Sequence, residues 1–227
     1  MPIPVVILGI GGNCVDILDT ILDINRSARR QRYECIGFLD DNPAVNGTRI
    51  HGIAVLGPLA GARRLRRARF VNGIGSPRNF RRKQAVIAQT GLSADRFVTL
   101  VHPTASVSGF SALGRGVVLL QHVTVASGAK VGDHVIILPS STVSHDAVVG
   151  DYACIAGGVC VSGGVTIGNS CYLGTNCSII GNVAIGEYSM IGMGSVVLKD
   201  IPPRSTFAGN PARALRKGAR SSRPSRR

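Results

Sequence analysis

The sequence predicts two folded units, a small α/β domain at the N-terminus and a parallel β-solenoid behind it. The solenoid follows from a strict repeat between Val101 and Val197, in which every sixth residue is Val, Leu or Ile. A period of six fits neither an α-helix nor a simple strand, and it is typical of hexapeptide solenoids. The α/β domain follows from an alternation of apolar runs, glycine turns and helical patterns before residue 99.

The N-terminal unit begins with an apolar run, Pro4 to Leu8, which predicts a strand. Gly9 to Gly12 predicts a tight turn, and apolar residues then recur at helical spacing over residues 15–22. Glu34 to Leu39 predicts a second, parallel strand that ends in Asp40-Asp41-Asn42. Such a βαβ unit can bring backbone N–H groups and a helix N-terminus to a phosphate.

The turn at Gly9 to Gly12 leaves two interpretations open. Cys14 stands where the dinucleotide fingerprint needs its third glycine, and Asp40 lies roughly thirty residues on instead of about twenty. The turn either holds the nucleotide part of a ligand or simply starts a helix. On the first interpretation, the candidate substrate-binding residues are Gly9, Gly11, Gly12, Asp40 and Asp41.

The rest of the N-terminal unit continues the alternation. Ala54 to Leu56 predicts a strand, residues 59–65 predict a helix, and Phe70 to Ile74 predicts a third long strand of a parallel sheet. Gly73 to Pro77 forms another turn that can face the crevice of the first glycine turn. A further helix leads to the domain boundary near residue 99.

Within the solenoid, eighteen residues make one three-sided coil. One third of the apolar positions are followed by glycines that stack on one corner, where a tight bend favours a residue without Cβ. These glycines are Gly114, Gly132, Gly150, Gly168 and Gly186. The pattern stops at Pro202-Pro203, because proline cannot donate to a strand ladder.

Composition and charge narrow the classes of function. No run of about 18 apolar residues and no basic leader are present, so we expect neither a membrane span nor a secretory signal. Six cysteines without metal-ligand spacing predict reduced thiols in the cytoplasm and no metal site.

The formal charge is +14, and the basic residues gather in two runs, residues 63–83 and 213–227. Neither run has the aromatic residues or signature of a nucleic-acid reader, so we expect no nucleic-acid partner. Three explanations of the charge are left open: attraction to anionic nucleotides, at most a peripheral contact with a membrane surface, or a solvated basic surface without a specific partner.

Several motifs, in their order and spacing, together resemble one family. The motifs are Gly9-Ile10-Gly11-Gly12, Gly37-Phe38-Leu39-Asp40-Asp41, Val143-Ser144-His145-Asp146, Gly150-Asp151, Gly163-Gly164-Val165-Thr166-Ile167-Gly168 and Gly209-Asn210-Pro211-Ala212-Arg213. The chain resembles the hexapeptide-repeat acyltransferases, in the branch of nucleotide-sugar N-acetyltransferases and sialic-acid O-acetyltransferase-like proteins. The resemblance implies an α/β N-terminal Rossmann-like domain followed by an all-β, left-handed parallel β-helix.

The resemblance also implies roles for residues of the solenoid. His145 would be the base that deprotonates a sugar amine, Asp146 would support it, and the Gly163 N–H would bind the thioester carbonyl. An exposed imidazole, with a pKa of about 6.5, can accept a proton at cellular pH. Without the resemblance, a histidine at a corner of a solenoid is more often a surface residue than a catalyst. Gly163 and Gly164 would then merely form a turn. The residues implied to contact the coenzyme are Gly163, Asn210, Pro211, Ala212 and Arg213.

One position departs from the family pattern. Many relatives have a second histidine nine residues after the base, where this chain has Cys154. We interpret Cys154 as having no covalent role in the reaction, because direct attack needs none. The other solenoid histidines, His102, His122 and His134, are interpreted as surface or contact residues.

We therefore expect residues 1–99 to form a Rossmann-like nucleotide-sugar-binding domain and residues 100–203 a left-handed β-helix acyltransferase domain. Residues 204–227 would form a coenzyme-contacting segment and a basic, disordered tail. We expect an N-acetyltransferase of glycan biosynthesis that uses acetyl-CoA to acetylate the amino group of a nucleotide-linked sugar, a 4-amino-deoxy sugar. The protein is expected to be cytoplasmic, homotrimeric and free of metal. The alternatives are an O-acetyltransferase on sialic acid or another sugar hydroxyl, and a non-catalytic nucleotide-binding solenoid scaffold.

Overall fold

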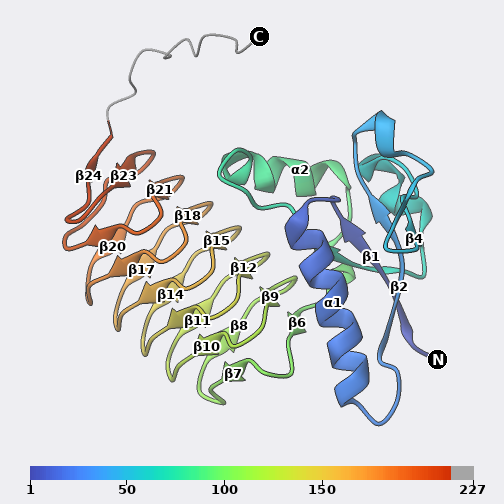
Figure 1. Cartoon of the computed structure of the whole chain (residues 1–227), viewed down its shortest axis with the longest axis horizontal. Coiled ribbons are helices and arrows are strands. Elements are labelled where there is room, and N and C mark those ends of the chain that lie inside the picture. The colour runs from blue at the N-terminus through green and yellow to red at the C-terminus, as the bar shows by residue number, and fades with distance from the viewer. Residues whose placement is uncertain (216–227) are drawn as a thin grey trace.

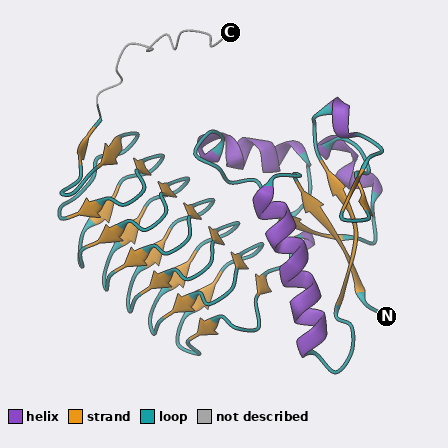
Figure 2. Cartoon of the chain, viewed as in Figure 1, coloured by secondary structure: helices purple, strands orange, loops and turns teal. Residues whose placement is uncertain are grey.

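The computed structural model describes residues 1–215, which form two units packed side by side (Figure 1). The predicted two-part fold is confirmed, because a small α/β domain precedes a parallel β-helix (Figure 2). The basic tail expected beyond Lys217 lies outside the described residues.

The N-terminal domain is built on a three-stranded parallel sheet in the order β2-β1-β5. The central strand β1 (Ile3–Leu8) is buried over its last four residues, and it is flanked by β2 (Tyr33–Leu39) and β5 (Arg69–Asn72). Helix α1 (Gly12–Ser27) connects β1 to β2. Because the three strands are parallel, the turns that follow their carboxyl ends lie at the same edge of the sheet.

Two predicted elements of this domain take another form. The helix predicted over residues 59–65 is a 3-10 helix, η2 (Leu59–Arg64). Residues 54–56 do not form a strand of the parallel sheet: β4 (Ile53–Ala54) pairs antiparallel with β3 (Arg49–Ile50), and only Val55 bridges to β2. The hairpin turns at His51 and Gly52, which both have positive φ and so reverse the chain within two residues.

The remaining helices of the domain are short. They are η1 (Pro43–Val45), η3 (Phe80–Arg82), α2 (Lys83–Gln89) and η4 (Ala94–Arg96).

The solenoid consists of three parallel sheets, and each coil gives one short strand to each sheet. The first, which we call the domain-facing sheet, contains β6 (Leu100–Val101), β9 (Val118–Leu119), β12 (Ile136–Ile137), β15 (Cys154–Ile155), β18 (Tyr172–Leu173), β21 (Met190–Ile191), β23 (Thr206–Ala208) and β24 (Arg213–Ala214). The second sheet contains β7 (Ser106–Val107), β10 (Thr124–Val125), β13 (Thr142–Val143), β16 (Cys160–Val161), β19 (Ser178–Ile179) and β22 (Val196–Val197). The third sheet contains β8 (Ala112–Leu113), β11 (Lys130–Val131), β14 (Val148–Val149), β17 (Thr166–Ile167) and β20 (Ala184–Ile185).

The core of the solenoid is made by the residues of the six-residue period, which is why the period is so strict. Val125, for example, pairs with Val143 one coil later, and both are buried among equivalent residues of the other coils. The glycine corner is equally constrained: a Cβ on Gly132 would lie only 2.3 Å from the side-chain oxygen of Asp151. That oxygen accepts the backbone N–H of Asp133 at 2.8 Å and so joins successive coils.

The ladder extends beyond the point where the sequence pattern stops. β23 pairs in parallel with β21 although Pro202 and Pro203 precede it, and β24 then turns back to pair antiparallel with β23. Proline interrupts only the corner, because Ile201 still bridges to Ile185 and the next strand begins after the prolines.

The two units are joined along the domain-facing sheet. Its outward residues Val118 and Ile136 are buried against the N-terminal domain, whose helices α1 and α2 lie along this side (Figure 1). Phe80 packs on Tyr172 with ring centroids 5.7 Å apart. At the start of the solenoid, Nε2 of the buried His102 lies 2.9 Å from a carboxylate oxygen of Asp23 on α1. These contacts fix the position of the N-terminal domain on the solenoid.

Candidate active site

A cavity of about 300 Å³ opens at the carboxyl edge of the parallel sheet. The turns after β1, β2 and β5 line it on one side, and the solenoid contributes the other wall. The lining residues are Gly9, Ile10, Gly11, Gly12, Asn13, Cys14, Asp40, Gly73, Ile74, Gly75, Ser76, Pro77, Asn79, Leu138 and Tyr172.

The cavity has the features of an anion site. Helix α1 begins here with Gly11 as its N-cap, so its first backbone N–H groups and the positive end of its dipole are directed at the cavity. A Cβ on Gly11 would meet nothing within 4 Å, so a ligand can approach this backbone closely. The Asn13 side chain donates to the Gly75 carbonyl at 2.9 Å and ties the first turn to the third.

Four of the five predicted substrate-binding residues lie together in this cavity, namely Gly9, Gly11, Gly12 and Asp40. Asp41 does not, because its side chain accepts the backbone N–H of Leu59 at 2.9 Å and caps η2. The sequence analysis missed Leu138 and Tyr172.

The three predicted catalytic residues meet at one corner of the solenoid. His145 and Asp146 lie between β13 and β14, and Gly163 lies between β16 and β17. His145 Nδ1 lies 2.9 Å from a carboxylate oxygen of Asp146, and the two side chains are 68% and 73% exposed. Since the carboxylate can only accept, Nδ1 carries the proton and donates it. The other ring nitrogen, Nε2, is thereby left as the acceptor, which is the form that a general base requires.

Gly163 lies beside the imidazole, one coil further along the same corner. A Cβ at this position would stand only 2.5 Å from Cε1 and Nε2 of His145, so the present ring position needs glycine here. The following residue, Gly164, donates its N–H to the His145 carbonyl at 3.0 Å. The Gly163 N–H itself donates no hydrogen bond to any group within residues 1–215, so it is available to an oxygen atom of a ligand.

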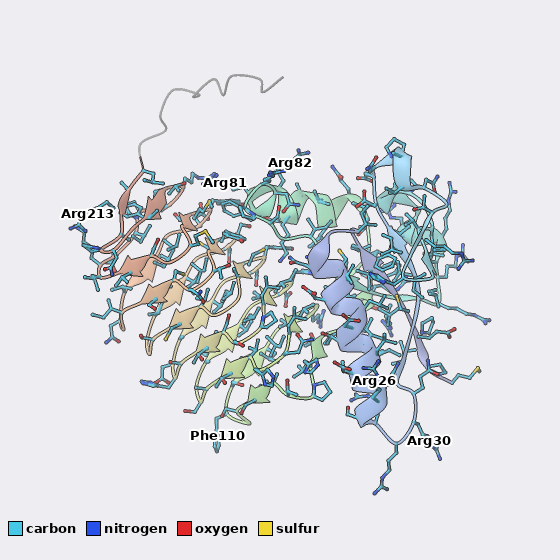
Figure 3. The ribbon with its side chains drawn as sticks, in the orientation of Figure 1. Arg26, Arg30, Arg81, Arg82, Phe110 and Arg213 are labelled. Carbon is cyan, nitrogen blue, oxygen red and sulfur yellow. The ribbon has the colours of Figure 1, made fainter. Side chains whose placement is uncertain are left out.

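The predicted coenzyme segment closes the solenoid on the side of the second sheet. Ala212 donates its N–H to the Val196 carbonyl of β22 at 2.8 Å, while Asn210, Pro211 and Arg213 are exposed. Arg213 projects away from the end of the solenoid (Figure 3). The segment therefore follows β13, β16, β19 and β22 as the next rung, four ladder steps of about 4.8 Å from the strand that precedes His145, or roughly 19 Å.

The cavity and the catalytic corner lie on different sides of one chain. The cavity adjoins the domain-facing sheet, whereas His145 lies where the second and third sheets meet. In a three-sided prism this corner is opposite the domain-facing sheet. A single copy therefore does not bring Asp40 and His145 into one site.

Cys154 and the remaining histidines lie elsewhere. Cys154 faces the N-terminal domain of its own chain and is buried, with its Sγ 3.5 Å from Lys83 Nζ. His134 is also buried there, stacked on Tyr152 with ring centroids 5.2 Å apart, and burial lowers its pKa to about 4. His122 is exposed, so the three other histidines are indeed surface or contact residues.

No group of three or more His, Cys, Asp or Glu side chains within residues 1–215 is arranged to hold a metal ion. None of the helices in these residues is both long and apolar enough to cross a membrane.

Models of known protein families match both units of the chain. A model of the PglD N-terminal domain matches residues 4–87, and the bacterial transferase hexapeptide (six repeats) model matches residues 128–163 and 164–199. No curated protein matches the chain in sequence.

Solved structures match almost the whole chain. The acetyltransferase domain of PglB from Neisseria gonorrhoeae FA1090 is 27% identical with a TM-score of 0.81, and the match covers 94% of this chain and 100% of that chain. A histidine-to-asparagine mutant of perosamine N-acetyltransferase from Caulobacter crescentus, in complex with CoA and GDP-perosamine, is 26% identical with a TM-score of 0.82, covering 94% and 97%. WeeI from Acinetobacter baumannii AYE, at 24% identity and a TM-score of 0.78, covering 93% and 99%, has the same fold.

A PglD-type α/β domain joined to hexapeptide coils defines the chain as an acyltransferase. It belongs to the hexapeptide-repeat acetyltransferases of the nucleotide-sugar N-acetyltransferase and sialic-acid O-acetyltransferase-like family.

Proposed function

We propose that the protein is a cytoplasmic, acetyl-CoA-dependent N-acetyltransferase whose acceptor is the amino group of a nucleotide-linked 4-amino-deoxy sugar. The observation that carries the proposal is the corner at which His145, bonded to Asp146, lies against Gly163. The PglB acetyltransferase domain was solved with acetyl coenzyme A, and the perosamine enzyme with CoA and GDP-perosamine, which supports both substrate classes.

His145 acts as the general base in this proposal. A sugar amine is largely protonated near neutral pH and must lose a proton to become a nucleophile. His145 Nε2 is free to accept that proton, and Asp146 holds the ring and stabilises the imidazolium that results. The high exposure of both side chains leaves room for an acceptor to approach.

Gly163 and the closing segment are proposed to hold the coenzyme, which supplies the acetyl group as a thioester. The unused Gly163 N–H can donate to the thioester oxygen as negative charge develops, a contribution typically worth about 3 kcal/mol. Asn210, Pro211, Ala212 and Arg213 lie roughly 19 Å further along the same side. This distance suits a coenzyme with a long pantetheine arm, and Arg213 can face a phosphate.

The cavity of the N-terminal domain is proposed to bind the nucleotide. The start of α1 offers N–H groups to the diphosphate, and Asp40 can accept hydrogen bonds from ribose or base. Because Gly11 has open space where its Cβ would be, Gly11→Phe would fill the cavity without a clash in the fold.

The separation of cavity and base supports a homotrimer in which neighbouring chains complete each site. His145 of one copy would meet the cavity of the next, which one chain alone does not allow. Three apolar residues near this corner, Phe110, Ile180 and Leu198, are exposed, and Phe110 projects from the solenoid (Figure 3). Apolar side chains in such a group are typical of an interface between copies.

Two inactive variants test the shared site. His145→Ala and Gly11→Phe should each be inactive alone, but their co-expression should restore part of the activity, because some interfaces then combine an intact base with an intact cavity. Mass measurement in solution should give a trimer. An active monomer, or failure of two folded and co-assembled variants to complement, would contradict the shared site.

Two measurements identify the acceptor: the binding of nucleotide sugars, and the type of bond that joins the acetyl group to the product. Thermal-shift measurements with UDP, dTDP, GDP and CMP sugars should show one preferred nucleotide, with no shift for Gly11→Phe. The acetylated product should resist mild base and hydroxylamine, as an amide does. A base-labile product would identify an O-acetyltransferase, and the absence of any transfer with all four nucleotide series would favour a scaffold.

A further inference from the structure

Lys83 is a completely buried amine at the junction of the two units. It is the first residue of α2, it has no exposed surface, and no carboxylate pairs with it within residues 1–215. Among the described residues, the hydrogen-bond partners of its Nζ are the Ala153 carbonyl at 3.4 Å and Cys154 Sγ at 3.5 Å. Burial lowers the pKa of this amine, so the neutral, nucleophilic form is more populated than in an exposed lysine.

Cys154 differs from the other buried cysteines in having this amine beside it. Cys14 and Cys171 direct their sulfur atoms at the backbone carbonyls of Leu8 and Gly186, and burial raises their pKa values to about 12 and about 11. Such thiols are inert. A thiol and an amine in direct contact are a reactive pair once the sulfur is oxidised.

The Cys154 thiol lies directly behind the wall of the cavity. A Cβ on Gly75, which lines the cavity, would stand 2.6 Å from the Cys154 Sγ. Glycine thus leaves the sulfur without a covering side chain at this point. Gly75 therefore marks the shortest approach to the sulfur for a small neutral oxidant, such as hydrogen peroxide, that enters the cavity.

We infer that Cys154 and Lys83 are a modification site, at which hydrogen peroxide produces a covalent S–N cross-link between the solenoid and α2. The sulfur first attacks one peroxide oxygen, so that an S–O bond forms, the O–O bond breaks and water leaves. The lone pair of Nζ then attacks the sulfenic acid sulfur, so that the S–N bond forms and the S–O bond breaks. The departing hydroxide takes a proton from the amine and leaves as water.

The sum of the two steps converts one peroxide into two waters and removes two hydrogens from the chain. Closing the last few ångströms is within reach, because a lysine side chain rotates about several bonds. The product ties α2 to β15 and so restrains the loop of residues 73–79, which lines the cavity just before α2. The cross-link would therefore couple oxidation to the shape of the cavity.

Peptide mass spectrometry of the peroxide-treated full-length protein tests this inference. We expect a peptide pair containing Lys83 and Cys154 that is lighter than its reduced components by two hydrogens, and that dithiothreitol separates. Cys154→Ser and Lys83→Met should not form it. Cys160→Ser, which removes an exposed thiol one third of a coil away, should form it as the wild type does.

Thermal unfolding of the wild type supplies a second measurement that does not depend on the variants folding. Because the link joins residues 71 positions apart, oxidation should raise Tm by at least about 5 °C, and reduction should reverse the rise. An unchanged Tm, a Cys154 found only as sulfinic acid, or a disulfide between Cys154 and Cys14 would overturn the inference.

Discussion

The domain-facing sheet and the His145 corner are two outer surfaces of the same coils, and they differ in almost every respect. On the sheet, outward residues such as Ile136 and Cys154 are buried under the N-terminal domain. At the corner, His145 and Asp146 are largely exposed and are hydrogen-bonded to each other. The inward residues behind both surfaces follow the same period of six. The period therefore fixes only the inward residues. The outward residues differ between the two sides, and they serve docking on one side and the proposed proton transfer on the other.

The largest effect should come from His145→Ala, which removes the proposed base from the exposed corner. A positioned base supplies roughly 10²- to 10⁴-fold in rate, so kcat should fall by that factor while coenzyme binding stays nearly constant. Steady-state kinetics and calorimetric titration with CoA measure the two quantities.

Cys154→Ser is the matched change on the docking side. It should keep near-wild-type kcat, because direct transfer needs no acetylated cysteine. An active His145→Ala together with an inactive Cys154→Ser would reverse the roles that we assign to the two surfaces.

The covered side should show a pH dependence of stability that the exposed corner lacks. Burial lowers the pKa of His134 to about 4, with Lys83 adding to the effect, whereas an unfolded histidine titrates near 6.5. The unfolded state therefore binds the proton first as the pH falls. Stability should be complete above about pH 6.5 and should decrease towards pH 4 by at most about 3 kcal/mol.

Urea unfolding between pH 7 and pH 4.5 measures this loss, and His134→Phe should flatten the curve by keeping a ring without a titrating group. His122→Phe is the matched control, since His122 has the same positive φ of 57° but is exposed. Equal pH dependence in wild type and His134→Phe would show that other groups cause the loss.

The sequence predicts a contact well when the two residues occupy equivalent or adjacent positions of the repeat. His145, Asp146 and Gly163 belong to consecutive turns of one corner, and the motifs of the family resemblance were enough to name all three. Tyr172 was missed, although a signal exists. The outward positions Val118, Ile136, Cys154, Tyr172 and Met190 include no Ser, Thr or Lys, whereas their equivalents on the other two sheets include all three residue types.

Contacts between distant segments had no such signal. The pairing of Lys83 with Cys154 depends on how one unit docks on the other. Asp41 looks equivalent to Asp40 in sequence, and only the position of Leu59 shows that it caps a helix.

A smaller catalytic effect should follow Gly163→Ala, which tests how closely the corner is built around the imidazole. The new methyl group would occupy the place of the His145 ring and displace it, and a misplacement of about 1 Å can cost roughly 10²-fold in kcat. Gly181→Ala is the control one coil further on, where a Cβ would meet only the Gly163 carbonyl at 3.1 Å and a Ser162 carbon at 4.0 Å. Equal kcat values for the two variants would mean that the ring position does not matter.

Among the variants of the corner, Asp146→Asn should have the smallest effect. An ion pair between two exposed side chains is typically worth up to about 1 kcal/mol, so kcat should fall by no more than roughly fivefold. Steady-state kinetics under the conditions used for His145→Ala measure this change. A loss as large as that of His145→Ala would show that Asp146 does more than orient and stabilise the imidazole.

The antiparallel strand β24 also bears on how the protein avoids growing into fibres. A stack of identical parallel rungs ends in an open row of N–H and C=O groups, onto which the first rung of another molecule could add in the same direction. β24 lies on this last rung in the opposite direction, so it does not offer an incoming parallel rung the right polarity. The chain thus ends its own ladder, and further assembly is left to the sides of the prism.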